Sequence, residues 1–142
     1  MAVSAPPPEP QPCADEAIRV TAEPARREFP IGERITLRIA VANVGRHECT
    51  RETGGMLREL IVLDGNGQRL WSSRDCYGES TDEPPVLQAG EVRSTEVRWS
   101  GHTSHPGCPA ERRAVAPGDY VLVAELGDLA SDPVPFRLTG GA

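Results

Sequence analysis

Two histidines and a cysteine are evenly spaced in the segment His102-x-x-His105-x-x-Cys108. Imidazole and thiolate groups in such a pattern are typical ligands of zinc and related metals. A stable site needs three or four ligands, however, and a cysteine that is held in a disulfide supplies none. We therefore expect no metal and no cofactor here, and we assign His102 and His105 to a loop available for recognition.

Two acidic stretches could in principle bind calcium. The segment Asp64-Gly65-Asn66-Gly67 is too short for a helix-flanked calcium loop and is typical of a tight hairpin turn. The second stretch combines an aromatic ring with four carboxylates: Tyr77, Asp75, Glu79, Asp82 and Glu83. Such a run is usually a solvated loop, with an acidic recognition surface as the alternative, in which Tyr77 and Asp82 are the candidate contacts.

Nucleophilic catalysis would require an activated serine or cysteine beside a histidine and an acid. The sequence has no Gly-x-Ser-x-Gly segment, and the two loop histidines have no evident partners. We therefore assign no catalytic residue and predict that the protein is not an enzyme.

The four cysteines are Cys13, Cys49, Cys76 and Cys108, and no two of them form a Cys-x-x-Cys pair. An even, spread set in a loop-rich chain is typical of two disulfides in an oxidising compartment. Three pairings are possible. Cys13 precedes the first predicted strand and Cys49 follows the second, and these two points are neighbours in an antiparallel pair. This favours Cys13–Cys49, which leaves Cys76–Cys108; four free thiols in a cytoplasmic protein are the alternative.

The elements that must position these residues are short extended segments. Apolar and polar residues alternate with a period of two in 34–43, where Ile35, Leu37, Ile39 and Val41 share one face. Similar patterns or turn signals predict seven strands, at 17–23, 34–43, 57–64, 68–73, 91–99, 119–126 and 133–139. No segment has a sustained helical period. The expected fold is all-β, an immunoglobulin-like antiparallel β-sandwich of about seven strands.

Four aromatic residues are the expected core anchors of this sandwich: Trp71, Trp99, Tyr120 and Phe136. A large aromatic side chain commonly fills the space between the two sheets of such a fold. Tyr120 follows a turn, and we expect its hydroxyl to bond nearby backbone, as in a tyrosine corner.

The 142 residues suffice for one domain, which we place at 17–139, between a proline-rich leader at 1–16 and a tail at 140–142. All fifteen basic residues are Arg, which we attribute to GC-rich codons, and the net charge is −6. This balance argues against binding of nucleic acid or an anionic membrane. Because no signal peptide or membrane span is evident, we expect a trimmed ectodomain whose anchor lies outside this sequence; a native disordered start is the alternative.

Several turns and core positions together resemble a known family. They are Asp64-Gly65-Asn66-Gly67, Trp71, Leu87-x-x-Gly90-Glu91, Val97-x-Trp99 and Pro117-x-x-Tyr120. Over about residues 57–138 this order resembles the bacterial intracellular proteinase inhibitor family, and also immunoglobulin-like modules of secreted and membrane-anchored bacterial proteins. The resemblance implies an immunoglobulin-like fold and a non-catalytic role. The four cysteines and the leader depart from an intracellular inhibitor, and no inhibitory residue is carried over.

These observations lead to three functional expectations. The first is a monomeric interaction module outside the cytoplasm, secreted or anchored at the cell surface, that presents loops 46–56, 74–86 and 100–117 to another envelope or extracellular protein. The second is a proteinase inhibitor acting through a loop that a disulfide pins in place. The third is a structural spacer within a larger surface protein.

Overall fold

The computed structural model describes residues 10–54, 57–75, 84–108 and 112–140, and the seven predicted strands are all present in them. Each lies within one residue of its predicted bounds. They are β1 (Ile18–Pro24), β3 (Ile35–Asn43), β5 (Arg58–Leu63), β6 (Arg69–Ser72), β8 (Val92–Trp99), β9 (Gly118–Leu126) and β11 (Val134–Thr139).

Four further strands lie in segments where no strand was predicted. They are β2 (Glu28–Pro30), β4 (Cys49–Thr50), β7 (Val86–Leu87) and β10 (Leu129–Ala130), and one turn of 3-10 helix, η1, spans Asp15–Ala17. The count of eleven therefore exceeds the expected seven. Segments of two or three residues are too short to show a period, so they become strands only through the neighbours they meet.

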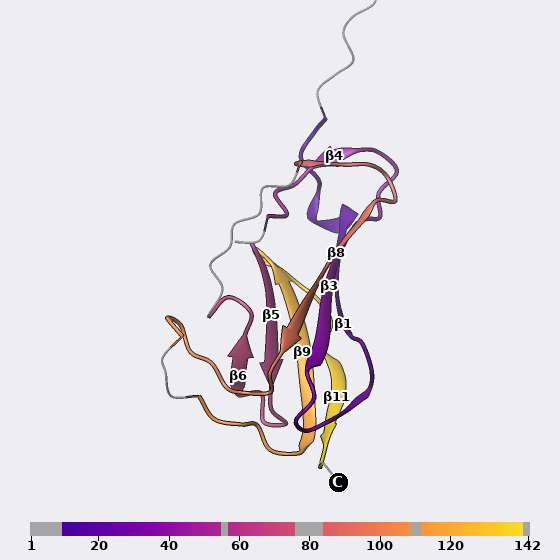
Figure 1. Cartoon of the computed structure of the whole chain (residues 1–142). Coiled ribbons are helices and arrows are strands. Elements are labelled where there is room, and N and C mark those ends of the chain that lie inside the picture. The colour runs from indigo at the N-terminus through magenta and orange to yellow at the C-terminus, as the bar shows by residue number, and fades with distance from the viewer. Residues whose placement is uncertain (1–9, 55–56, 76–83, 109–111, 141–142) are drawn as a thin grey trace, which may run out of the picture.

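The strands form two facing sheets (Figure 1). One sheet has the order β1–β3–β8, and the other has the order β2–β11–β9–β5–β6, with β10 beside β9. A small third pair, β4–β7, lies at one end. All named strand pairs are antiparallel except β2 with β11, which is parallel because the chain crosses between the sheets after β1. The expected immunoglobulin-like sandwich is thus confirmed, with one parallel edge pair added.

The core lies between the inner faces of the two sheets. Along β3 the side chains of Ile35, Leu37, Ile39 and Val41 are all buried, as the alternation predicts. The four proposed aromatic anchors are buried as well, and ring contacts connect all four of them. The Trp99 ring lies 5.5 Å from that of Trp71 and 6.5 Å from that of Phe136, between centroids. Since β8 belongs to one sheet and β6 and β11 to the other, these rings connect the sheets.

Tyr120 lies just after the turn that leads into β9. Its hydroxyl donates a hydrogen bond to the backbone carbonyl of Ala116, four residues earlier. This is the arrangement of a tyrosine corner. The Tyr120 ring also packs 6.1 Å from the ring of Phe136, so the bond ties the turn to the core. Burial is the main reason that the pKa of Tyr120 is raised above 10, and the charge of Asp64 adds to it.

We expect Tyr120→Phe to lower the free energy of unfolding by about 1 kcal/mol at pH 8, because the Ala116 carbonyl loses its donor while the ring stays in place. Urea unfolding measures this change. Leu122→Ala is the comparison, since deleting a fully buried side chain of the same strand costs about 2–5 kcal/mol.

The same pair of proteins gives a pH test. The raised pKa means that folded Tyr120 keeps its proton after unfolded Tyr120 has lost it, so this contribution to stability is complete below pH 10 and declines as the pH rises. The difference between wild type and Tyr120→Phe should therefore narrow above pH 10. A difference that is constant from pH 8 to pH 11 would contradict the assignment.

Candidate functional site

One end of the sandwich brings together three segments that are far apart in the sequence, namely 11–13, 44–53 and 84–91 (Figure 1, top). We call this end the disulfide pole. Thr50 N donates to Gln11 O and Cys13 N donates to Thr50 O, each over 2.9 Å, so the N-terminal segment runs parallel to β4. On its other side β4 pairs with β7, where Cys49 lies opposite Leu87. The three segments therefore form one small ladder.

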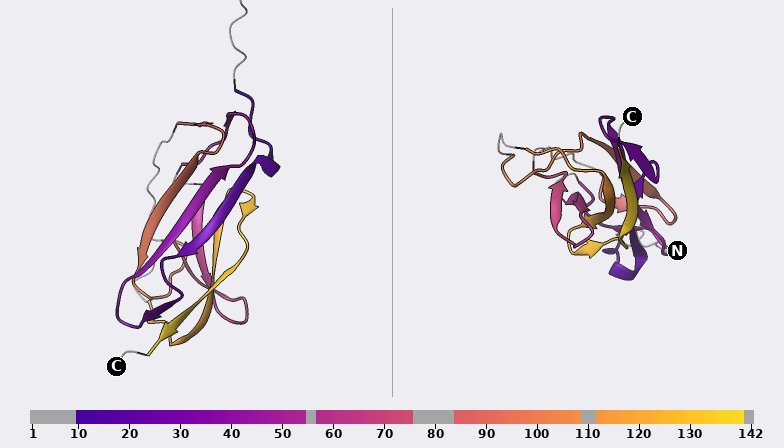
Figure 2. Two further views of the ribbon diagram at one scale, coloured as in Figure 1. Left: turned by 90° about the vertical axis from the view of Figure 1, so that its right-hand side faces the viewer. Right: turned by 90° about the horizontal axis from the view of Figure 1, so that it is seen from below.

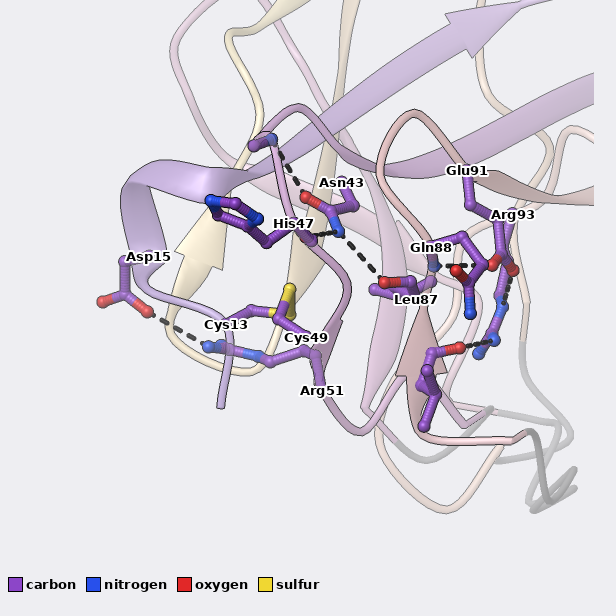
Figure 3. Close-up of a disulfide and its surroundings, with 12 residues drawn as sticks. Cys13, Asp15, Asn43, His47, Cys49, Arg51, Leu87, Gln88, Glu91 and Arg93 are labelled. Atoms are coloured by element: carbon purple, nitrogen blue, oxygen red, sulfur yellow. Dashed lines mark hydrogen bonds and ion pairs between the residues drawn. A yellow bond between two sulfur atoms is a disulfide. The ribbon is translucent and has the colours of Figure 1, made fainter. Parts of the chain in front are cut away.

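The disulfide at this pole joins Cys13 to Cys49, as the strand order predicted. Both residues are buried, and the bridge crosses the ladder beside His47 (Figure 3). An ion pair between Arg51 and Asp15, at 3.1 Å, supports the same connection from outside. The bridge spans 36 positions of sequence, so its largest effect is to restrict the unfolded chain and to keep the N-terminal segment on the domain.

Asn43, the last residue of β3, connects the loops of this pole. Its side chain is completely buried, and its amide nitrogen donates to His47 O at 2.9 Å and to Leu87 O at 3.0 Å. Its amide oxygen accepts from Gly45 N at 2.9 Å (Figure 3). One side chain thus satisfies backbone groups of both the 44–48 loop and β7, which holds the two loops at a set distance.

Arg93, on β8, does the same for the 84–91 segment. Its guanidinium donates to the carbonyl oxygens of Pro84 and Val86 and to Thr53 Oγ1, the last at 3.0 Å. Its Nε pairs with Glu91 at 2.9 Å (Figure 3). A hydrogen bond from Gln88 N is the main cause, and the Arg93 contact the second, of the lowered pKa of Glu91.

The surface of the disulfide pole is hollowed on both sides of β4. One hollow, of about 420 Å³, lies between the N-terminal segment and the loop that carries Arg46, His47 and Glu48. The other, of about 400 Å³, is lined by residues that include Arg51, Leu57 and Asp128. Both are open and mixed in polarity, which suits contact with a protein surface better than enclosure of a small molecule.

The structure places the predicted recognition residues elsewhere. His102 and His105 lie in the loop after β8, at the end of that strand opposite to the disulfide pole. His102 Nδ1 is 3.2 Å from Ser100 Oγ, and His105 is exposed. Cys108 is disulfide-bonded, whereas Cys76, its predicted partner, lies with Tyr77 and Asp82 outside the described residues. Within the described ranges no three His, Cys, Asp or Glu residues are grouped to hold a metal.

A second polar cluster fixes the histidine-bearing loop to β6. Ser104 Oγ donates to Asp75 at 2.6 Å and accepts from Ser72 N at 3.1 Å, and all three residues are buried. The same carboxylate pairs with Arg69. Because the Ser104 hydroxyl directs its proton at a carboxylate that is itself paired, the cluster serves to hold the loop.

Sequence reasoning missed both Asn43 and Arg93. The sequence pattern marks Asn43 only as the end of a strand, and Arg93 is one of fifteen arginines. A weak signal was available for Asn43, because asparagine followed by Val44-Gly45 is a common way to leave a strand. Nothing in the local sequence distinguishes Arg93, since its bonding partners are backbone carbonyls and polar side chains of the separate segments 44–53 and 84–91.

Comparison with known proteins supports the fold. No model of a known protein family matches the sequence, and no curated protein matches it. Among solved structures, a β-glucosidase from Listeria innocua aligns with 87% of this chain at 12% identity and a TM-score of 0.52. A β-glucosidase from Erythrobacter marinus aligns with 86% at 13% identity and a TM-score of 0.50. The chain covers only 16% and 15% of these enzymes, so the likeness concerns the sandwich alone.

We expect Asn43→Ala to lower the free energy of unfolding by about 2–4 kcal/mol, because two carbonyls and one N–H group lose hydrogen bonds to a side chain that is completely buried. Chemical denaturation measures it. The matched control is Gln88→Ala, which removes an exposed amide that bonds Glu48 in the same pole and should change stability by less than about 0.5 kcal/mol. Equal effects of the two substitutions would refute the role given to Asn43.

We further expect the double variant Cys13→Ala/Cys49→Ala to be about 4 kcal/mol less stable than wild type, from the chain entropy that the closed loop removes. Thermal and urea unfolding measure this loss. Hydrogen exchange provides the local readout: the amides of Cys13 and Thr50 should lose protection, while those of β9 keep theirs. Loss of protection spread evenly over the sandwich would show that the bridge stabilises more than this pole.

Proposed function

We propose that this protein is a non-catalytic interaction module that works outside the cytoplasm and that binds another envelope or extracellular protein through its disulfide pole. The observation that carries the proposal is the way in which Cys13–Cys49, Asn43 and Arg93 hold three loops of that pole in one arrangement. A surface that is ordered before binding loses less conformational entropy on association, which is why rigid loops are suited to recognition.

The pole also has the chemistry of a protein-binding surface. The loop after β3 exposes Arg46, His47 and Glu48 next to one hollow, so charges of both signs lie together there. Val44, at the start of the same loop, is an exposed apolar residue that lies beside β1 instead. Interfaces between proteins combine such groups, and arginine is enriched in them. Of the predicted recognition loops, the proposal retains residues 46–53 and 84–86 as parts of the binding surface. It does not include the 100–117 loop, which lies at the opposite pole.

The disulfide supports a location outside the cytoplasm, because reducing systems keep thiols free inside the cell. In the described part of the chain no helix is long and apolar enough to cross a membrane. We propose a secreted or surface-anchored protein on the strength of the disulfide.

A spacer role is the second candidate, and one observation favours it. The N-terminal segment joins the domain at the disulfide pole, whereas β11 ends at the opposite pole (Figure 1). A sandwich with its ends at opposite poles separates whatever is attached to them by its full length. The proteinase-inhibitor alternative depends on a loop pinned by Cys76–Cys108, of which Cys76 lies outside the described residues.

The test uses one substitution at each pole. Purified protein is cross-linked to proteins of the cell envelope and culture medium, any captured protein is purified, and its affinity is measured by calorimetry. Arg46→Glu, at the disulfide pole, should weaken binding at least tenfold, whereas Arg34→Glu, exposed at the opposite end of β3, should leave it unchanged. If no partner binds saturably, or if both variants bind with equal affinity, the proposal of an interaction module is rejected in favour of the spacer role.

A further inference from the structure

The strand β1 ends its sheet, and its outer edge is open in the described residues. The sheet order is β1–β3–β8, so β1 has a strand neighbour on one side only (Figure 2, left). Beyond its other edge lies a hollow of about 420 Å³, which is bordered across the gap by residues 130–132 and by Val134. A second hollow, of about 750 Å³, continues along the same edge and shares Ala22 and Val134 with the first. The edge therefore faces space in which another strand could lie.

The hydrogen-bond pattern shows which backbone groups point into that space. Ala25 N donates to Thr36 O, and Val44 N donates to Ala17 O, at the two ends of the β1–β3 ladder. Residues bonded to β3 in an antiparallel pair alternate with residues that bond outward. Odd-numbered residues of β1 therefore bond β3, and Val20 and Ala22 direct their N–H and C=O groups to the open edge. Pro24 has no N–H, and the N–H of Ile18 donates to Asp15 O.

The charges of the solvent-facing side chains of β1 are complementary to those of a second, antiparallel copy of the strand. These side chains are Arg19, Thr21 and Glu23, since Ile18, Val20 and Ala22 face the core. When the strand is set antiparallel to a second copy with Thr21 opposite Thr21, Arg19 of each copy lies opposite Glu23 of the other. In the same register Val20 lies opposite Ala22, so their outward backbone groups exchange four hydrogen bonds.

Other registers lose this match. In any register, outward-bonding residues of one copy must lie opposite outward-bonding residues of the other. The residue that lies opposite itself, here called the centre, therefore moves by one position from one allowed register to the next. A centre at Val20 places Arg19 opposite Thr21, and a centre at Ala22 places Glu23 opposite Thr21. Centres at Arg19 or Glu23 set like charges opposite each other, which is unfavourable. Only the centre at Thr21 joins opposite charges, and it also pairs two threonines, a favourable cross-strand combination.

We propose that the occupant of this edge is a second copy of the same chain, joined through β1 about a twofold axis at Thr21. The two three-stranded sheets then continue as one sheet of six strands, with both inner faces on the same side. This self-pairing is isologous, as in most soluble homodimers. It differs from the sequence-based expectation of a monomer. The hollow that the second copy borders shares no lining residue with the hollow beside Arg46, His47 and Glu48 at the disulfide pole.

The contact area is small, so the association is weak and is sought at high protein concentration. Sedimentation equilibrium up to the highest soluble concentration should show a monomer–dimer equilibrium for the wild type. Arg19→Glu and Glu23→Arg should each weaken the dimer at least tenfold, because like charges then lie opposite. The double variant Arg19→Glu/Glu23→Arg should recover most of the affinity, since opposite charges meet again. Circular dichroism and urea unfolding verify that each variant is folded.

Arg98→Glu is the matched control. Arg98 is exposed on the same face of the sheet but belongs to β8. If two copies paired through β8 instead of β1, Arg98 of one copy could lie opposite Glu96 of the other. The dimer constant should not change in this variant. A wild type that stays monomeric at every concentration, charge reversals in β1 without effect, or a dimer that is lost in Arg98→Glu would each overturn the proposal. None of these outcomes touches the proposed role of the disulfide pole, which is tested with Arg46→Glu.

A direct test of register uses Thr21→Cys. The two copies of this residue would form a non-hydrogen-bonded pair with Cα atoms about 4.5 Å apart, a distance that a disulfide can span. Mild oxidation should then give a covalent dimer, whereas Ser94→Cys, exposed on β8, should remain monomeric under the same conditions. Equal cross-linking of the two variants would show random collision and would overturn the register.

Discussion

The contact of Trp99 with aromatic rings of the facing sheet is the interaction on which the rest of the structure depends. Trp99 ends β8 in the three-stranded sheet, and it meets Trp71 of β6 and Phe136 of β11 in the other sheet. Its indole N–H donates to His102 O at 2.9 Å, so its one polar atom is satisfied at the core boundary. With the sheets held face to face, the alternating side chains of β3 and β9 fill the space between them.

The ends of such a sandwich are its weak points, because loops there leave the core and must satisfy their backbone groups by other means. At the disulfide pole this is done by one covalent bridge and two polar side chains, Asn43 and Arg93, each of which bonds several backbone groups. At the other end the buried Ser104–Asp75 bond and the Tyr120 hydroxyl have the same effect. Loops that are fixed in this way are suited to recognition, since they lose little conformational entropy when a partner binds.

The edges of the sandwich raise a different problem, because an open strand offers unpaired backbone groups to any other strand. At β6 the loop after β8 meets this need, as Ser104 N donates to Leu70 O. At β1 the outward groups of Val20 and Ala22 face a hollow instead. The charges of Arg19 and Glu23 on either side of Thr21 then determine which strand fits: they favour a reversed copy of the same segment and disfavour a shifted one.

The sequence predicted the fold class, the seven longer strands and the aromatic core, and it favoured Cys13–Cys49 among three possible pairings. Each of these is recorded locally: a strand by the period of its own residues, a hairpin by Asp64-Gly65-Asn66-Gly67, and the bridge by the order of two adjacent strands. The short strands β2, β4, β7 and β10 carry no period, so they were missed.

Which loops meet depends on how the two sheets pack in the folded protein. The tertiary structure placed the 44–53 and 84–91 segments together at one pole and the 100–108 segment, with His102 and His105, at the other, whereas the sequence predicts that loops 46–56, 74–86 and 100–117 all serve recognition. It also gave Asn43 and Arg93 their roles, because Asn43 bonds the Leu87 carbonyl 44 positions away and Arg93 bonds the Thr53 hydroxyl 40 positions away. Hydrogen-bond partners so distant have no trace in local pattern, since only the closing of the two sheets brings them within reach.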